Sequence, residues 1–434
     1  MVHVDKNSRC VADTLGASET RKQQASTIAT GSIAVWLSSY YLLTQTFFDR
    51  ISLGGLIMES VNRYPTWLQI IATISLGLVA LSALAIRDKP LQPSSHPRVW
   101  LLTLCLWVPI MITYLRSVRH DPSDGALESI IIATSVGAVS ACIAMGSGKV
   151  IWVMALIGFI QSVYAIIYQH GLLHGMLSGT IYRAGGTFGD PNALYTLMLV
   201  ALPFSLVGAI SASNAVVKIL YLVASAAEFA TLLLSLSRGG ILGVGASVVV
   251  LAYFLTKSKR VTVTVLAGAL ALALLVNLER ASGPANIASV TRSNISRLAM
   301  MKSGWTTFVH HPIAGAGIDS FRASWSTRRG ESEIHNVVND PKNLYLYWLA
   351  ERGIVGGLLF VLFAWTIYVL VRRSLVSPLA ISTGAAWIGL LVAGLVDTPF
   401  GPSDRYVGNY CFGFLLGCSV WLQVGLNPSD ETNS

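Results

Sequence analysis

Long apolar runs recur along this chain between Ile28 and Leu426, and they constrain its fold more strongly than any other feature. Each run has roughly the 20 residues that an α-helix needs to cross a hydrocarbon core. In lipid, only helices and closed barrels satisfy their backbone hydrogen bonds, and continuous rather than alternating runs favour helices. Only 12% of the residues are charged, too few to cover a soluble domain of this size. The sequence therefore predicts an all-α membrane protein.

The apolar runs predict about 12 transmembrane helices and one large periplasmic loop. The predicted spans are residues 29–48, 66–86, 99–117, 126–145, 150–169, 193–210, 215–235, 240–256, 261–278, 344–371, 379–396 and 408–425. The polar N-terminal segment lacks the apolar stretch and cleavage site of a signal peptide, so it is predicted to be a tail. The predicted organisation is a tail (1–28), helices (29–278), the large loop (279–343), helices (344–425) and a second tail (426–434).

Basic residues in the short connections predict the orientation of the helices. One side holds Lys218, residues 257–260 and residues 372–373, and short basic connections stay in the cytoplasm. Both termini are therefore predicted to be cytoplasmic, in a multi-pass protein of the bacterial inner membrane. The loops at 170–192 and 279–343 then face the periplasm.

The predicted periplasmic side carries more than half of the 30 Lys and Arg residues, and most of these are arginines. Positive charge on the translocated side opposes the usual bias. The planar guanidinium group suits bidentate binding of phosphate, whereas lysine offers a point charge. Individual arginines can equally anchor helices at headgroups or pair with acids in the loops. Together they indicate that an anionic substrate is handled outside.

The sharpest local motif, residues 235–240, reads Ser-Leu-Ser-Arg-Gly-Gly and joins two spans on the periplasmic side. Ser237 can cap the following helix, and free amides at the positive end of that helix favour an anion. The two glycines are expected to let a ligand approach the backbone. The alternative is a snorkelling arginine beside a tight turn. We favour the functional interpretation of Arg238, because ionisable groups within membrane segments are usually functional.

A second motif, residues 183–192, reads Arg-Ala-Gly-Gly-Thr-Phe-Gly-Asp-Pro-Asn. Asp190 or Asn192 can cap the apolar helix that follows, and Pro191 suits its first turn. Arg183 is not explained by the start of a helix, and it is a candidate contact for the substrate.

A third motif, residues 311–321, begins His-Pro-Ile-Ala-Gly-Ala-Gly, and its glycines predict a tight loop that acts as a scaffold. His310 and His311 have no partner at a spacing typical of metal sites. The 5 cysteines also lack such a spacing, so no metal site and no disulfide framework is predicted.

The fourth motif closes the large loop and enters the next span. His335 is the best candidate for a general base, because its ordinary pKa lies near 6.5, and Glu333 or Asp340 could replace it. A solvated loop histidine without a role is the alternative. Lys342, a cation at neutral pH, fits a phosphate contact better than a base.

Two residues beyond Lys342 are candidates for supporting roles. Asn343 directly follows it at the start of the predicted span. Glu351 lies about two helical turns further along the same face, where it could orient the site or pair with the neighbouring Arg352.

These motifs, in this order and on this side of the membrane, resemble the O-antigen ligase and polysaccharide polymerase family. The resemblance extends from about Arg183 to Gly356. It implies an integral membrane glycosyltransferase that takes a glycan from an undecaprenyl-pyrophosphate carrier at the periplasmic face. Ligases in this family pass the glycan to the lipid A core, and polymerases pass it to another lipid-linked repeat unit. Carried over by motif, Arg183 and Arg238 would bind the pyrophosphate.

The resemblance also implies which other molecules take part. It implies no nucleotide sugar, metal or cofactor. The expected partners are the lipid-linked glycan, its acceptor and membrane lipid, together with chain-length regulator and flippase proteins. A nucleic acid partner is not expected.

One position departs from the pattern of the ligases in this family. They commonly show His followed by Asn, Ser or Gln, then nine residues, then Gly-x-x-Gly. This chain has Lys342 and Asn343, then nine residues, then Gly-Ile-Val-Gly at 353–356. Because lysine replaces the histidine, we predict a polymerase of exopolysaccharide or O-antigen repeat units, with a ligase as the alternative.

A transporter or flippase for an anionic lipid is the third possibility. Such a protein should carry ionisable groups deep within its spans, along a path across the membrane. The apolar runs are nearly free of charge apart from Glu228. Chemistry at one face of the membrane is therefore the preferred prediction.

Overall fold

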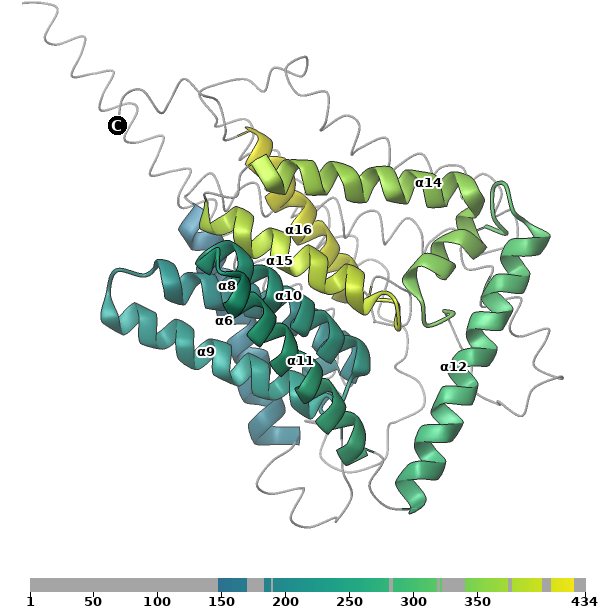
Figure 1. Ribbon diagram of the computed structural model, residues 1–434, viewed down its shortest axis with the longest axis horizontal. Helices are drawn as coiled ribbons and strands as arrows, with labels where there is room; N and C mark the ends of the chain where they lie inside the picture. The colour runs from purple at the N-terminus through teal and green to yellow at the C-terminus, as the bar shows by residue number, and fades with distance from the viewer. Residues whose placement is uncertain are drawn as a thin grey trace, which may run out of the picture.

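The computed structural model describes residues 147–169, 183–188, 190–280, 284–317, 321, 340–373, 377–399 and 407–424, and these ranges contain helices and no strand (Figure 1). The α-helices are α6 (Ser147–Tyr164), α8 (Pro191–Ser211), α9 (Ala215–Leu234), α10 (Arg238–Thr256), α11 (Lys259–Arg280), α12 (Pro284–His310), α14 (Leu344–Arg373), α15 (Pro378–Ala393) and α16 (Val407–Val424). A π-helical turn, η2 (Ala165–Gln169), follows α6, and a 3-10 turn, η3 (Gly186–Phe188), precedes α8. The predicted all-helical class is confirmed for this part of the chain.

Five of the described helices are long and apolar enough to cross a membrane. They comprise Gly148–Ile167, Pro191–Ser211, Ala215–Leu234, Arg238–Thr256 and Leu344–Val369. Helix α15 is apolar but shorter. The first four predicted spans and the N-terminal tail lie outside the described residues, so the total of 12 and the sidedness stay predictions.

Helix α8 forms the centre of the bundle, where it packs against α6, α9, α10, α15 and α16. Most of its side chains are buried, including Tyr195 and Phe204. Phe204 meets Phe414 of α16 edge to face, with 5.3 Å between the ring centroids. An all-round apolar helix is expected in this position, because every face of it contacts another helix.

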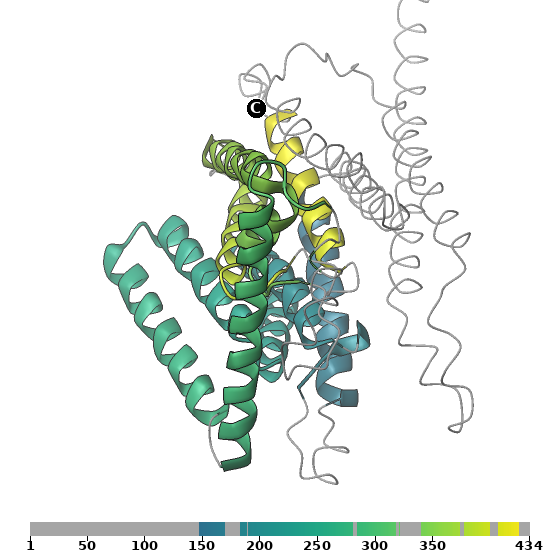
Figure 2. The same cartoon turned by 90° about the vertical axis from the view of Figure 1, so that its right-hand side faces the viewer.

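The outer helices present large apolar side chains on their outer faces. Leu220 of α9, Val263 of α11 and Leu358 of α14 are each more than half exposed. Figure 2 shows α11 at the edge of the bundle. Lipid tails solvate such side chains as well as a protein core does, so these faces fit a membrane environment.

The predicted large loop contains regular structure. Helix α12 accounts for 27 of its residues and packs against α14 (Figure 1). A compact turn over residues 311–317 follows α12 and leads back towards α14. The loop is therefore a folded element in the part that the structure describes.

The glycines of this turn and of α14 dock against each other. The backbone N–H of Gly317 donates to the carbonyl oxygen of Glu351 at 3.0 Å. Gly353 kinks α14 with φ 66° and ψ −165°. A Cβ atom on Gly315 would lie 2.2 Å from backbone atoms of Glu351, and one on Gly353 would lie 2.4 Å from the carbonyl oxygen of Ile313. Only glycine fits at these positions, which confirms the predicted scaffolding role of the third motif.

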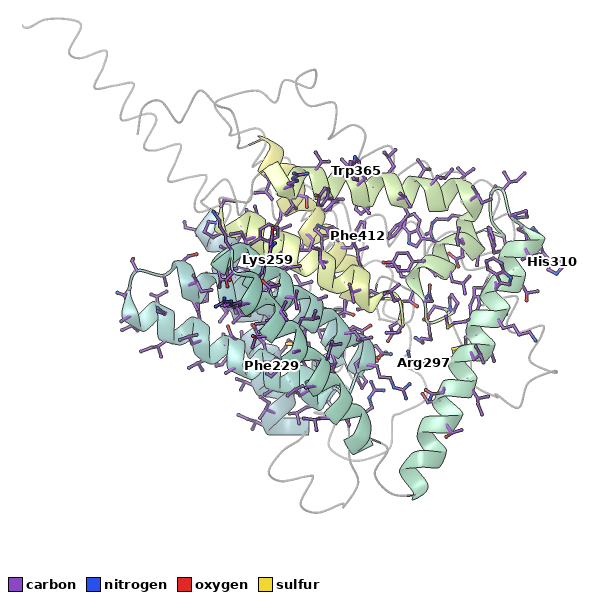
Figure 3. The ribbon with its side chains drawn as sticks, viewed as in Figure 1. Phe229, Lys259, Arg297, His310, Trp365 and Phe412 are labelled. Atoms are coloured by element: carbon purple, nitrogen blue, oxygen red, sulfur yellow. The ribbon has the colours of Figure 1, made fainter. Side chains whose placement is uncertain are left out.

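Helices α10 and α15 also approach each other closely. A Cβ atom on Gly243 would lie 2.6 Å from the carbonyl oxygen of Gly389, and the hydroxyl of Ser247 donates to the carbonyl oxygen of Ala385 at 2.8 Å. This contact holds the start of α10 next to the end of α15. Lys259 and Arg297 mark opposite ends of the bundle (Figure 3).

Candidate functional site

Arg183 is tied to the turn between α9 and α10. Its Nε atom donates to the carbonyl oxygen of Ser235 at 2.9 Å, and the N–H of Ala184 donates to the carbonyl oxygen of Leu234 at 3.0 Å. These bonds hold the segment that begins at Arg183 against the turn between α9 and α10. The structure thus brings the first and second motifs together, although about 50 residues separate them in sequence.

Arg238 is the first residue of α10, directly after this turn. Ser237 is the N-cap, as predicted, and its side chain accepts a hydrogen bond from the N–H of Gly240. Arg238 donates from one terminal nitrogen to the Oδ1 atom of Asn294 on α12. Its Nε atom is buried and has no hydrogen-bond partner among the described residues. A buried guanidinium N–H without a partner is costly, and an anionic ligand would satisfy it.

The turn itself contains a residue in the left-handed backbone region. Leu236 has a φ of 49°, which is uncommon for a residue other than glycine. Such conformations cost about 1–3 kcal/mol and often occur where function needs a fixed geometry. The turn therefore holds Arg183 and Arg238 on a constrained backbone.

Protein atoms fill the space beside the two glycines that follow Arg238. A Cβ atom on Gly239 would lie 3.3 Å from both the hydroxyl oxygen of Tyr195 and the Cβ atom of Asp397. A Cβ atom on Gly240 would lie 3.0 Å from the Cβ atom of Tyr195. The expectation that these glycines leave room for a ligand was wrong, because they allow close packing of α8 and the end of α15 instead.

Asp397 follows α15 and is the central carboxylate of the site. Its side chain is 1% exposed, and its Oδ2 atom lies 3.8 Å from a terminal nitrogen of Arg297 on α12. Arg297 also donates to the carbonyl oxygen of Val396. Two segments far apart in sequence, α12 and the end of α15, thus meet through one ion pair.

Lys342, just before α14, also pairs with the carboxylate of Asp397. Its Nζ atom lies 3.0 Å from the Oδ2 atom of Asp340 and 3.7 Å from the Oδ1 atom of Asp397. The Oδ1 atom of Asp340 accepts from the hydroxyl of Thr398 at 2.6 Å and from the backbone N–H of Lys342 at 2.8 Å. Lys342 has a φ of 54°, so a second residue of the site is held in the left-handed region.

Electrostatic interactions link these groups into one site. Burial lowers the pKa of the Arg183 guanidinium, the nearby Asp190 raises it, Arg297 lowers it and Asp397 raises it. Arg297 also lies close enough to Arg238 to interact with it. We call Arg183, Arg238, Arg297, Lys342, Asp340 and Asp397 the polar cluster. Its three guanidinium groups and the ammonium group of Lys342 gather positive charge at this place, which favours an oxyanion ligand.

Part of the chain that forms this site is similar to a known family. Residues 220–361 match the family model described as O-Antigen ligase. The predicted resemblance to the O-antigen ligase and polysaccharide polymerase family is thereby confirmed. No curated protein matches the chain.

The matched segment of this chain contains most of α9, all of α10, α11 and α12, and the first part of α14. Arg238, Arg297 and Lys342 lie within it, whereas Arg183 precedes it and Asp397 follows it. The packing described above nevertheless places all five in the polar cluster. The site is therefore assembled from the matched segment and from non-helical residues on either side of it.

Asn343 supports the polar cluster through the backbone. Its Oδ1 atom accepts from the N–H of Leu346 at 2.9 Å and caps α14, while its Nδ2 atom donates to the carbonyl oxygen of Leu395 at 2.7 Å. The N–H of Leu344 donates to the carbonyl oxygen of Gly394 at 2.8 Å. These bonds dock the start of α14 on the end of α15, which brings Lys342 to Asp397.

Glu351 lies in the scaffold that the glycines form. Its buried carboxylate is 3.6 Å from a terminal nitrogen of Arg352, whose guanidinium carbon lies 4.5 Å from the ring centroid of Trp348. This pairing with Arg352 is one of the two roles predicted for Glu351. The catalytic candidates His335 and Glu333 lie outside the described residues, so their roles stay predictions.

Two members of the polar cluster, Arg297 and Asp397, were not singled out from the sequence. Arg297 was one of many arginines on the predicted periplasmic side. Asp397 had a usable signal, because a carboxylate directly at the end of an apolar span is costly unless it is paired. Among the described residues, no group of three His, Cys, Asp or Glu side chains could hold a metal ion.

Proposed function

We propose that this protein polymerises undecaprenyl-pyrophosphate-linked oligosaccharide repeat units at the periplasmic face of the inner membrane. The match to the O-antigen ligase family supports glycan ligation or polymerisation as the general activity. The single observation that carries the proposal is the convergence of Arg183, Arg238 and Arg297 at one end of the helix bundle. Three guanidinium groups in one partly buried site form a strong binding site for a pyrophosphate.

Arg183 and Arg238 are the proposed direct contacts to the pyrophosphate. The bond from Arg183 to Ser235 uses Nε and fixes the direction of the guanidinium group. Arg238 projects from the N-terminus of α10, where the helix dipole and free amides also favour an anion. The positions of both arginines support a shared ligand at the turn between α9 and α10.

The carboxylates of the polar cluster are proposed to hold its cations in place. Asp397 lies between Arg297 and Lys342 and offsets the repulsion between like charges. Lys342 is paired with two carboxylates, so its proposed role is to complete the positive surface rather than to bind phosphate alone. Asn343 and Glu351 are proposed to support the site from the scaffold.

The proposed reaction is a single displacement at the anomeric carbon of the donor sugar. The acceptor hydroxyl oxygen forms a bond to this carbon as the bond to the pyrophosphate oxygen breaks, with inversion. Negative charge develops on the departing pyrophosphate, where Arg183 and Arg238 stabilise it. His335 takes the proton of the acceptor hydroxyl, with Glu333 as the alternative. Asp340 is less suited to this role, because it accepts hydrogen bonds from Lys342 and Thr398.

Ligation to the lipid A core is the second candidate, because the matching family model is described as O-Antigen ligase. The lysine at position 342 favours the polymerase, since ligases of the family commonly have histidine there. A transporter is disfavoured, because the Lys, Arg, Asp and Glu side chains of the five helices that are long and apolar enough to cross a membrane lie near the helix ends, apart from Glu228 and the Glu351–Arg352 pair.

A strain that lacks this protein distinguishes these functions. We expect loss of long polysaccharide and accumulation of single lipid-linked repeats, both restored by the wild type but not by Arg238→Ala. Persistence of long polymer that is no longer attached to lipid A core would identify a ligase. Full complementation by Arg238→Ala would contradict the proposed pyrophosphate site and reopen the transporter alternative.

A further inference from the structure

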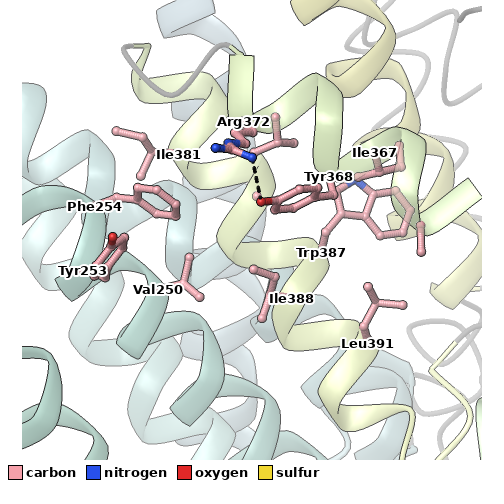
Figure 4. A pocket seen from close by; sticks show the side chains of 13 residues that line it. Val250, Tyr253, Phe254, Ile367, Tyr368, Arg372, Ile381, Trp387, Ile388 and Leu391 are labelled. Carbon is pink, nitrogen blue, oxygen red and sulfur yellow. Dashed lines mark hydrogen bonds between the residues drawn. The ribbon is translucent and has the colours of Figure 1, made fainter.

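A cavity lies on the flank of the bundle, away from the polar cluster. It has a volume of about 300 Å³ and is lined by α10, α14 and α15. Tyr253 and Phe254 of α10 form one side, Tyr368 and Arg372 of α14 form the other, and Ile388 of α15 lies between them (Figure 4). Its lining is mostly apolar and aromatic, which suits a hydrocarbon chain.

The length of the cavity matches one leaflet of a membrane. Along α15 the lining runs from Ile381 to Leu391, which corresponds to roughly 15 Å at the helical rise of about 1.5 Å per residue. A hydrocarbon core is about 30 Å thick, so one leaflet is about 15 Å. One acyl chain of a phospholipid would therefore fit along it.

The mouth of the cavity is cationic. Arg372 is exposed at the end of α14, and one of its terminal nitrogens donates to the hydroxyl of Tyr368 at 3.4 Å. Lys257 and Lys259 are exposed just beyond the end of α10, whose last turns line the cavity. Neither residues 250–260 nor residues 364–388 contain an acidic residue. A phosphate group at this mouth would meet positive charge without a competing carboxylate from these two segments.

We propose that this cavity binds an anionic phospholipid, with one acyl chain between α10 and α14 and its phosphate on Arg372. The wall of the cavity is fixed, because the Nε1 atom of Trp387 donates to the hydroxyl of Ser419 on α16 at 3.1 Å. The headgroup lies at the end of the bundle opposite the polar cluster. The bound lipid is therefore distinct from the glycan donor, whose pyrophosphate belongs at the other end.

Lipid binding to the purified full-length protein in detergent tests this proposal. Native mass spectrometry would compare phosphatidylglycerol with phosphatidylcholine of the same acyl chains. We expect phosphatidylglycerol to bind about tenfold more tightly, since its headgroup carries a net negative charge, whereas the choline cation of phosphatidylcholine offsets the phosphate and is repelled by the cations at the mouth. Arg372→Gln should remove this preference. Ile388→Trp, which fills the cavity, should weaken the binding of both lipids.

Lys218→Gln is the matched control, because Lys218 is an exposed cation at the same end of the bundle, on α9 and away from the cavity. It should leave the preference unchanged. Equal binding of the two lipids, or an equal loss of preference in Lys218→Gln, would overturn the proposal. Undecaprenyl phosphate that binds more tightly than phosphatidylglycerol and is displaced by Ile388→Trp would assign the cavity to the donor chain instead. Glycan transfer does not enter this experiment, so its outcome is independent of the proposed function.

Discussion

The Nε atom of Arg183 donates a 2.9 Å hydrogen bond to the carbonyl oxygen of Ser235, three residues before Arg238. This bond joins the loop before α8 to the turn before α10, and it holds Arg183 against the turn that leads into Arg238. A pyrophosphate has charged oxygens on both phosphorus atoms, so two fixed guanidinium groups suit it better than one.

Arg238 should contribute through the shape of its guanidinium group as well as through its charge. Arg238→Lys keeps a cation but loses the planar fork, so we expect glycan transfer to fall about tenfold. Arg238→Gln should reduce it by about 100-fold, since a hydrogen bond to a charged group contributes about 1.5–3 kcal/mol. Transfer from a purified undecaprenyl-pyrophosphate-linked repeat measures both. Equal activity of wild type and Arg238→Lys would show that only the charge matters.

Asp397 should be required although its proposed role is indirect. Asp397→Asn keeps the side-chain shape but removes the charge that pairs with Arg297 and Lys342, so we expect transfer to fall by about tenfold or more. Lys218→Gln is the control, because it removes a charge at the opposite end of the bundle. It should retain most of the activity. Unchanged transfer in Asp397→Asn would remove this carboxylate from the site.

Lys342 should stabilise the fold as well as the site. Lys342→Met leaves the buried carboxylates of Asp340 and Asp397 without this cation, and we expect a loss of about 2–4 kcal/mol in the free energy of unfolding. Thermal unfolding in detergent measures this loss. The double variant Asp340→Asn with Lys342→Met should recover part of it. If the effects of the two substitutions on the free energy of unfolding are additive, the ion pair between Asp340 and Lys342 makes no net contribution to stability.

The docking of Gly315 on α14 should be sensitive to a single methyl group. Gly315→Ala places a Cβ atom 2.2 Å from backbone atoms of Glu351, at a φ of 70°. We expect a loss of about 2 kcal/mol or more in the free energy of unfolding. Gly148→Ala is the control, because a Cβ atom there would meet nothing within 4 Å, and alanine favours a helix. Comparable destabilisation by both changes would contradict the scaffolding role.

The sequence predicted the helices better than the site. Helices α6, α8, α9, α10, α11, α14, α15 and α16 each overlap a predicted span, because an apolar run of this length has few alternatives. Local signals also predicted the caps, since Asp190 and Ser237 act through residues two or three positions away. The helix α12 within the large loop was not predicted, because it has no long apolar run.

The contacts that assemble the polar cluster join residues far apart in sequence. Asp397 pairs with Arg297, which is 100 residues away in sequence, and with Lys342, which is 55 residues away. No local pattern encodes such a meeting, which depends on the close packing of α10 with α15 and of α14 with the end of α15. The glycines at 239 and 240 were misinterpreted for the same reason, since their neighbours Tyr195 and Asp397 come from other helices.

The most direct test of the central claim is the affinity of the purified protein for undecaprenyl pyrophosphate. We predict that Arg183→Gln and Arg238→Gln each weaken binding by at least about tenfold. Lys218→Gln, which changes a cation at the opposite end of the bundle, should bind as the wild type does. Equal binding by the wild type and both arginine variants would contradict the proposal that the polar cluster holds the pyrophosphate of the donor.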